Sequence, residues 1–361
     1  MPESFEKYFT QKEEEKSPEE IKEEKALALS EEIKRIKEKK EKTIEDYQKI
    51  IELSRKIKEM YEEKGEFISE KAKEIYQSLK ETPLWDEEKK QWNWFMTEEG
   101  ELIDSRRYSE AQLLGVLAEA VAGNLEKAKE IYQSLKETSL WDKEKKQWNW
   151  AMNKKGELIS SYRDSEVQLL GVLAEAVTGN LEKAKEIYQS LKETPLWDEG
   201  KKQWNWYMNK EGKLINSDRY SKVQLLGVLA EAVTGNLEEA KEIYQSLKET
   251  SFWDKEKKQW NGFMNKKGEL ISSGRASGIQ LLGVLAEAVA GNLEEAKEIY
   301  QSLKETSLWD KEKKQWNWAM NKEGKLIDSR RYSEAQLLGV LAEAVDEKGE
   351  EFIEFLTKEN K

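Results

Sequence analysis

The sequence predicts a mainly α-helical toroid, in which pairs of antiparallel helices and the hairpins that join them surround a common axis. Three observations lead to this prediction. A unit begins at Glu70, Glu126, Glu182, Glu238 and Glu294, a period of 56 residues without a gap; each unit holds two helical segments with a Trp-rich stretch between them; and further helical segments flank the array. Tandem units of this length bury their apolar faces against one another and form one continuous body.

The chain begins with a charged extension over residues 1–42. Runs such as Lys37 to Lys42 carry too little apolar surface to offset the entropy of packing, and we expect residues 1–16 to be disordered. A helix is predicted from about residue 18, because Ser17 can cap it and Pro18 suits the first turn. Its thin apolar stripe, of Leu29, Ile33 and Ile36, either packs on the body or on a partner, or leaves the helix solvated; a coiled coil is less favoured because three heptads are not sustained.

Within the first unit, the outer helix is predicted over 70–82, since Ala72, Ile75, Tyr76 and Leu79 share one face. Residues 91–96 and 101–104 alternate as the two strands of a hairpin, which places the two tryptophans of the first strand on one face. The inner helix begins at Ser109, where Ser109 and Gln112 form the pattern of a capping box in all five units. Residues 113–121 are apolar nearly all round, so this helix is predicted to be buried on several sides.

The segments at the two ends of the array predict how it closes. Residues 43–64 read as a helix in the place of an inner helix, and residues 350–356 stand where a sixth outer helix would begin. Together with the units at 70–125, 126–181, 182–237, 238–293 and 294–349, they make six helix pairs within a body spanning 43–361. We therefore expect an (α/α)6-like ring closed by the N- and C-terminal helices, with an open superhelix as the alternative.

Composition excludes several classes of function. The net charge of -12 and the pI near 5.1 argue against a nucleic-acid partner, which requires a clustered positive surface. The chain has no Cys and no His, so thiolate chemistry, disulfides and His-dependent nucleophilic triads are excluded. We assign no catalytic residue, no metal ligand and no cofactor. No stretch approaches a membrane span and the N-terminus lacks an export signal, so we expect a cytoplasmic protein; abundant Lys and Glu favour a thermostable one.

Each unit resembles the N-acylglucosamine and cellobiose 2-epimerase family, as the residues of the first unit illustrate. The resemblance rests on Trp85-Asp86, Trp92, the Gly100 turn, Asp104-Ser105-Arg106-Arg107, Gln112, Ala118-Glu119-Ala120 and Gly123-Asn124. It implies an (α/α)6 barrel, whose helices are joined by hairpin-bearing loops over a sugar-binding cleft. Members of that family use histidines as acid and base. This chain has none, so no catalytic position is carried over.

Two sets of residues are candidates for ligand binding. Tryptophans of the predicted hairpins can stack on sugar rings, or pack on the helix ends beneath them. An arginine two residues before each inner helix can contribute to a ring that binds a carboxylate, phosphate or sulfate, or can pair locally with an acid. The candidate residues are Trp92, Trp94, Arg107, Trp148, Trp150, Arg163, Trp204, Trp206, Arg219, Trp260, Arg275, Trp316, Trp318 and Arg331.

Three positions vary sharply between units whose helices hardly change. They are Phe95/Ala151/Tyr207/Phe263/Ala319, Arg106/Tyr162/Asp218/Gly274/Arg330 and Tyr108/Asp164/Tyr220/Ala276/Tyr332. A constant scaffold with a variable rim is how repeat proteins build specificity, although drift at exposed positions gives the same pattern. In the fourth unit Gly262 replaces a tryptophan, which predicts a notch.

These observations favour a non-catalytic repeat protein whose Trp-rich hairpin face binds a carbohydrate or a protein segment. The first alternative is a carbohydrate-active enzyme that uses paired carboxylates, for which the Asp after each first tryptophan (Asp86, Asp142, Asp198, Asp254 and Asp310) would be candidates. These aspartates more often bond their own turn. The second alternative is an engineered or recently duplicated scaffold without an evolved ligand.

Overall fold

The computed structural model describes residues 18–37, 39, 43, 49–50, 53 and 69–357, and the chain forms two compact units, residues 1–65 and 66–361. In the first unit, helix α1 (Pro18–Lys37) begins where predicted; Leu29 is half-buried and Ile36 is buried. The side chain of Ile33, residues 1–16 and most of the helix predicted over 43–64 lie outside the described residues. No helix within the described part of the chain is long and apolar enough to cross a membrane.

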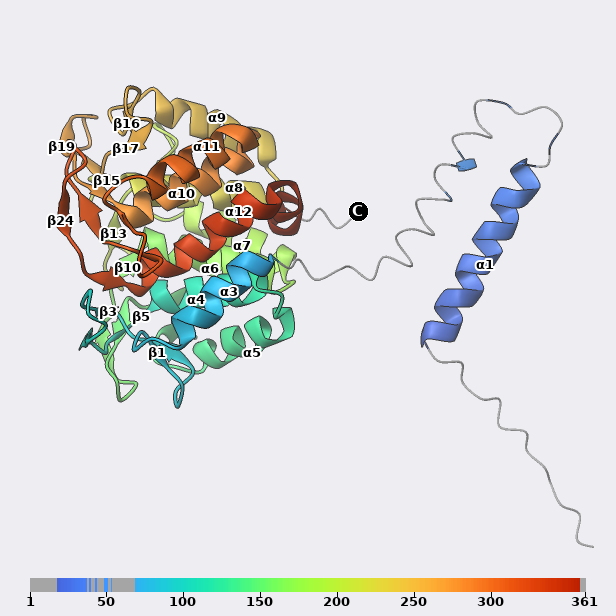
Figure 1. Ribbon diagram of the computed structural model, residues 1–361, viewed down its shortest axis with the longest axis horizontal. Helices are drawn as coiled ribbons and strands as arrows, with labels where there is room; N and C mark the ends of the chain where they lie inside the picture. The colour runs from blue at the N-terminus through green and yellow to red at the C-terminus, as the bar shows by residue number, and fades with distance from the viewer. Residues whose placement is uncertain are drawn as a thin grey trace, which may run out of the picture. The chain divides into compact units, whose positions relative to one another are not determined.

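The second unit is a ring of helix pairs with all its strands at one end (Figure 1). The outer helices are α3 (Glu70–Lys80), α5 (Leu125–Lys136), α7 (Leu181–Lys192), α9 (Leu237–Lys248) and α11 (Leu293–Lys304). The inner helices are α4 (Ser109–Val121), α6 (Ser165–Val177), α8 (Ser221–Val233), α10 (Ser277–Val289) and the first part of α12 (Ser333–Thr357). The α/α toroid of five helix–hairpin–helix repeats is therefore confirmed.

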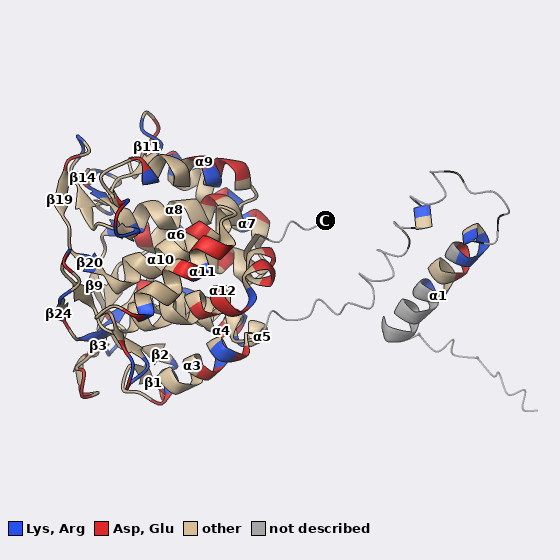
Figure 2. Ribbon diagram, turned by 45° about the horizontal axis from the view of Figure 1, so that its top comes forward, with Lys and Arg blue, Asp and Glu red and all other residues tan. Residues whose placement is uncertain are grey.

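Burial follows the predicted pattern. Each outer helix buries a stripe, which in α3 is Ala72, Tyr76 and Leu79, whereas every residue of α4 is buried. Charged residues accordingly gather on the outer helices and turns, and the inner helices are largely uncharged (Figure 2). One buried polar pair recurs in all five units: Tyr76 Oη donates to Glu119 Oε2 at 2.8 Å, and the equivalent Tyr–Glu bonds form in the other four.

Each unit contributes five short strands. They are β1 (Trp85–Asp86), β2 (Gln91–Trp92), β3 (Phe95–Met96), β4 (Leu102–Asp104) and β5 (Arg107–Tyr108); β6 (Trp141–Asp142), β7 (Gln147–Trp148), β8 (Ala151–Met152), β9 (Leu158–Ser160) and β10 (Arg163–Asp164); β11 (Trp197–Asp198), β12 (Gln203–Trp204), β13 (Tyr207–Met208), β14 (Leu214–Asn216) and β15 (Arg219–Tyr220); β16 (Trp253–Asp254), β17 (Gln259–Trp260), β18 (Phe263–Met264), β19 (Leu270–Ser272) and β20 (Arg275–Ala276); β21 (Trp309–Asp310), β22 (Gln315–Trp316), β23 (Ala319–Met320), β24 (Leu326–Asp328) and β25 (Arg331–Tyr332).

The strands pair both within and between units. β1 pairs with β2, and β3 pairs with β4, whereas β5 pairs with β8 of the next unit. The continuous strand predicted over 91–96 is thus broken at 93–94, and its two halves belong to different sheets. Each three-stranded sheet therefore joins two consecutive units.

The ring closes on itself after five units rather than six. Strand β25 of the last unit pairs with β3 of the first, with Arg331 opposite Met96. Inside the array, each inner helix packs on the next inner helix, and each outer helix packs on the inner helix that precedes it. The same two contacts close the ring, because α12 packs on α4 and α3 packs on α12. Because five units complete the circle, the ring needs no sixth pair made by the terminal helices.

The C-terminal segment fills the end of the ring opposite the strands. Helix α12 kinks at Lys348, and its last part carries Phe352 and Phe355, both buried. These rings lie against one leucine from each inner helix and leave a cavity of about 20 Å³; the leucines are Leu117, Leu173, Leu229, Leu285 and Leu341. The segment predicted to be a sixth outer helix is a plug on the axis.

The predicted capping box does not form, because its two side chains bind the hairpins instead. Ser109 Oγ donates to the carbonyl oxygen of Asn149 in the next unit at 2.5 Å. Gln112 accepts from the Trp92 amide at 2.9 Å and donates to the Trp92 carbonyl at 2.7 Å. The S-x-x-Q pattern thus reflects tertiary contacts that fix each hairpin to its own and its neighbour's inner helix.

Candidate functional site

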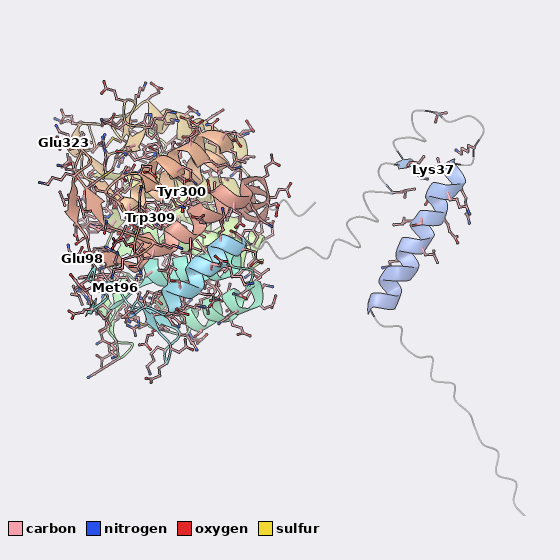
Figure 3. The ribbon with its side chains drawn as sticks, viewed as in Figure 1. Lys37, Met96, Glu98, Tyr300, Trp309 and Glu323 are labelled. Carbon is pink, nitrogen blue, oxygen red and sulfur yellow. The ribbon has the colours of Figure 1, made fainter. Side chains whose placement is uncertain are left out.

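The strand-bearing face of the ring holds all the residues that the sequence singles out. The inner helices begin there, each directly after a strand of the shared sheets. Glu98 and Glu323, which lie in the hairpin turns, mark the outer edge of this face (Figure 3). Any ligand site on this face is therefore built from the hairpins and the first turns of the inner helices.

The first tryptophan of each predicted hairpin strand serves the core. Trp92 is 2% exposed, and its ring lies 5.0 Å from Trp85 and 5.8 Å from Tyr76. It packs so closely on the inner helix that a Cβ added at Gly115 would lie 2.3 Å from its Nε1. Its copies are buried in the same way: Trp148, Trp204, Trp260 and Trp316. For this group the structure supports packing on the helix below rather than an open binding surface.

The second tryptophan of each hairpin lies in a different environment, because the strand breaks before it. Trp94 packs 4.1 Å from the ring of Tyr108 and meets Tyr332 edge-on at 5.4 Å. Trp150 and Trp206 are its copies in units two and three, and Trp318 is its copy in unit five. The expectation that both tryptophans of a unit share one face does not hold. The second set, unlike the first, reaches the surface of the hairpin face.

The arginine candidates are buried in local ion pairs. Arg107 is 1% exposed, and its Nη2 lies 2.5 Å from Asp86 Oδ2 of the same unit. Asp86 also accepts from the Lys89 amide at 3.0 Å, which is the turn-bonding role expected for this aspartate. The other four arginines form the equivalent ion pair with the aspartate of their own unit; they are Arg163, Arg219, Arg275 and Arg331. The five guanidinium groups thus brace their own hairpins, and the geometry favours local pairing over a ring open to an anion.

The fourth unit interrupts the aromatic surface, but Gly262 does not open a simple notch. Gly262 is buried, and a Cβ added there would lie 3.4 Å from the carbonyl oxygen of Gly274. The backbone of a neighbouring glycine thus comes close to the position from which an indole would extend. The next residue, Phe263, stacks on Tyr220, with the ring centroids 4.2 Å apart.

One pocket on this face lies between units two and three. It has a volume of about 220 Å³ and is lined by Trp150, Tyr162, Asp164, Trp206 and Tyr207. The shared sheet positions these residues, since Asp164 of β10 lies opposite Tyr207 of β13. Tyr162 and Trp150 are 50% and 37% exposed, unusually open for such large rings. Three of the five lining residues come from the three positions that vary between units.

Asp164 distinguishes this pocket from the equivalent places in the other units, which carry Tyr or Ala. Its carboxylate caps helix α6, because Oδ1 accepts from the Glu166 amide at 2.8 Å. Burial, followed by the charge of Glu166, raises the pKa of Asp164 to about 7, although that amide, Lys222 and Trp206 oppose the rise. Near neutral pH the carboxyl therefore exists in both protonation states, and it can accept or donate a proton.

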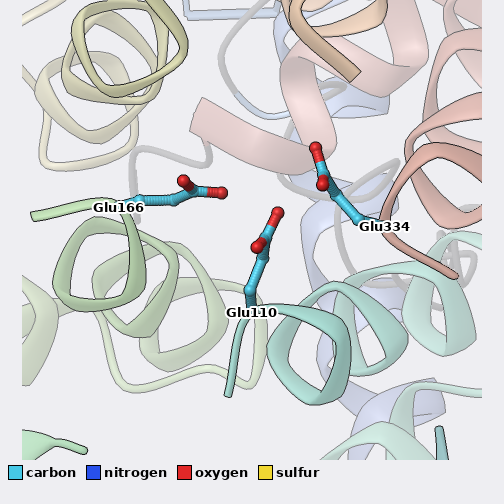
Figure 4. A group of neighbouring side chains, drawn as sticks. All are labelled: Glu110, Glu166 and Glu334. Atoms are coloured by element: carbon cyan, nitrogen blue, oxygen red, sulfur yellow. The ribbon is translucent and has the colours of Figure 1, made fainter. Parts of the chain in front are cut away.

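A buried charge cluster lies next to the pocket on the ring axis. Glu110, Glu166 and Glu334, each the second residue of its inner helix, direct their carboxyl groups toward one another (Figure 4). Lys222, from the same position of α8, forms an ion pair with all three. All four are less than 8% exposed. The remaining inner helix, α10, has Gly278 at this position, and a Cβ on this residue would collide with Glu334 Oε1.

The three carboxylates could in principle coordinate a cation, since one oxygen from each lies within 4.8 Å of the others. Lys222 already supplies a positive charge among them. Burial raises the pKa of Glu110 and Glu334. Burial alone would lower the pKa of Lys222, but the surrounding carboxylates together raise it above its usual value. The sequence analysis missed this cluster, although aligning the units shows Glu, Glu, Lys, Gly and Glu at one otherwise well-matched position.

Solved structures share the fold. A D-mannose isomerase superposes with a TM-score of 0.54 at 11% identity, over 76% of this chain and 96% of that chain. A sugar epimerase from a ruminal bacterium gives a TM-score of 0.55 at 16% identity, over 80% of this chain and 85% of that chain. Cellobiose 2-epimerase from Bacillus thermoamylovorans B4167 gives a TM-score of 0.52 at 16% identity, over 87% of this chain and 84% of that chain. The chain shares the α/α toroid fold of these proteins. No family model and no curated protein matches the sequence.

Proposed function

We propose that this protein binds a carbohydrate in the pocket between units two and three. The observation that supports it is the lining: two tryptophans and two tyrosines surround a space that also contains one carboxyl group. Aromatic faces stack on the apolar faces of sugar rings, and a carboxylate accepts hydrogen bonds from hydroxyl groups. The volume of about 220 Å³ is below the roughly 300–1,000 Å³ of drug-sized sites, so a single sugar unit is the expected occupant.

Two further observations support this place over the rest of the face. Trp92, Arg107 and their copies are already packed or paired within the protein, so they offer a ligand little free surface. The pocket also combines residues that differ from their counterparts in other units, namely Tyr162, Asp164 and Tyr207. A variable rim on a constant scaffold then acts as the source of specificity.

The experiment is a titration of intrinsic tryptophan fluorescence with neutral monosaccharides and short oligosaccharides. We expect a saturable change in the wild type and a loss of affinity of about tenfold, or about 1.4 kcal/mol, in Trp206→Ala. The matched control is Trp318→Ala, the equivalent residue of unit five, which packs against the ring of Tyr332 outside the pocket. Equal losses in both variants, or no binding by the wild type, would contradict the proposal; a peptide library screened in parallel tests a protein segment as the occupant.

A second function, acid-catalysed cleavage of a glycosidic bond, is favoured by the raised pKa of Asp164. A general acid of pKa near 7 can protonate the leaving oxygen, while a second carboxylate activates water or attacks the sugar. Among the residues that line the pocket, however, Asp164 is the one carboxylate, and nearby Glu166 is paired with Lys222. Binding is therefore the primary proposal. Release of nitrophenolate from nitrophenyl glycosides, abolished in Asp164→Asn, would favour catalysis instead.

A further inference from the structure

The pocket has the composition of a site for an organic cation. Four aromatic side chains and a carboxylate line it, and no arginine or lysine is among them. The ring faces of Trp and Tyr attract ammonium groups through their quadrupole, and this attraction grows when the cation is removed from water. Tyr162 and Tyr207 lie 5.7 Å apart, and Trp206 meets Tyr207 edge-on at 5.2 Å, so the rings form adjoining walls rather than one flat stack.

Carboxyl groups outnumber ammonium groups beside the pocket. Asp164 bonds the amide of Glu166, whose carboxyl belongs to the axial cluster with Glu110 and Glu334. Against these four carboxyl groups stands one ammonium, that of Lys222. The nearby Arg163 is already paired with Asp142. A cation beside Asp164 favours the ionised form of that carboxyl group, and the two charges then attract each other directly.

The aspartate itself is specific to this place. Tyr108, Tyr220 and Tyr332 occupy the equivalent position in units one, three and five, where they extend the aromatic surface. At this one interface a carboxylate replaces the ring and leaves space beside two tryptophans. Among the described residues no Lys or Arg forms an ion pair with Asp164. Its carboxylate accepts from the Glu166 amide, and Lys222 acts on it only from the axial cluster, so the ammonium group of a ligand would be its direct ionic partner.

We infer that the pocket selects a ligand with a cationic amine, so that the sugar bound there is an amino sugar whose amino group is free and protonated. The inference rests on the proposed function and specifies the substrate class. The ammonium group lies between the aromatic walls and forms an ion pair with Asp164, while the sugar ring stacks on Trp150 or Trp206.

The test compares three ligands that differ at one substituent: glucosamine, N-acetylglucosamine and glucose, titrated by calorimetry at constant ionic strength. We expect glucosamine to bind at least about tenfold more tightly than the two neutral sugars, the ratio expected for one desolvated ion pair with its cation–π contacts. Tetramethylammonium chloride, a probe for the cation alone, should displace glucosamine from the wild type, whereas an equal concentration of sodium chloride should not.

Two variants of the same residue keep the test decisive. Asp164→Asn can still cap α6 but lacks the charge, so it should lose the preference for glucosamine while its affinity for glucose changes little. Asp164→Tyr introduces the residue of the sister units and should abolish binding of all three sugars; circular dichroism confirms that each variant folds. Equal affinities for glucosamine and glucose in the wild type would overturn the inference and leave the proposed function standing. Absence of binding by any sugar would overturn both.

Discussion

The backbone amide of Ser333 donates a hydrogen bond to the carbonyl oxygen of Trp94 at 3.0 Å, although 239 residues separate them. The same bond joins Ser109 to Trp150 at 3.0 Å between consecutive units. The interface between the last and the first unit therefore has the same hydrogen bond as the interfaces between consecutive units. Charged side chains meet on the axis at the starts of the inner helices, and the C-terminal segment of α12 with its phenylalanines fills the other end.

The contact between each inner helix and the tryptophan above it leads to a first prediction. In Gly227→Ala, the new Cβ would lie 2.5 Å from Nε1 of buried Trp204. We expect a net loss of stability, since overpacking costs about 1–3 kcal/mol and the better helix propensity of Ala recovers up to about 1 kcal/mol. Urea denaturation measures it. The control is Gly200→Ala in the same unit, where the nearest atom is Asp198 Oδ1 at 3.6 Å and a change within about 0.5 kcal/mol is expected.

The buried Tyr–Glu bonds predict steep unfolding in alkali. Burial, and then the charge of Glu231, raise the pKa of Tyr188 well above its usual value, as happens at Tyr76, Tyr132, Tyr244 and Tyr300 with their own glutamates. Above about pH 10 the unfolded chain loses these protons and the folded chain keeps them, so stability falls as pH rises, by about 1.4 kcal/mol per pH unit for each tyrosine.

Replacing one of these tyrosines measures how much it contributes to the alkaline loss of stability. Tyr188→Phe should reduce the alkaline slope of the unfolding free energy by about 1.4 kcal/mol per pH unit. Near neutral pH it should cost about 1–3 kcal/mol, because Glu231 loses a buried donor. Denaturant titrations on both sides of about pH 10 give both values. An unchanged slope would show that the hydroxyl does not stay protonated in the folded chain.

Removing the ammonium group from the axial cluster should lower the stability of the fold by an amount that depends on pH. Lys222→Met would leave three buried carboxyl groups without their cation, at a cost of about 3–5 kcal/mol near pH 8. Lys222 lowers the pKa of Glu110 and Glu334, so its removal raises both further. The folded variant then binds protons more tightly than the unfolded chain, and stability should recover as pH falls toward about 5. A deficit that stays constant with pH would contradict this account.

The C-terminal plug predicts that the last turns of the chain belong to the core. Phe352 is fully buried on the axis, and Phe352→Ala should cost about 3–5 kcal/mol in urea denaturation. Glu354→Ala, on the exposed side of the same helical segment, should change stability by less than about 0.5 kcal/mol. Similar small effects of both substitutions would mean that the plug contributes little to the ring.

The sequence pattern within each unit determined the helices of this protein and which of their faces are buried. The period of the repeat, the amphipathic stripe at Ala72, Tyr76 and Leu79 and the apolar run after Ser109 predict the outer and inner helices and the burial of each, because helical spacing and side-chain polarity are properties of neighbouring residues. The variable positions also pointed to Tyr162, Asp164 and Tyr207.

Tertiary structure decided how these parts meet. The rotation from one unit to the next depends on helix and sheet packing, so the number needed for closure, five rather than six, could not be counted from the segments. The Ser109 hydroxyl and Gln112 bind hairpin backbone rather than cap the helix, because closer partners arrive from other parts of the fold. For the same reason, only placement in space separates Trp150 and Trp206, which line a pocket, from Trp92, which is sealed beneath the hairpin.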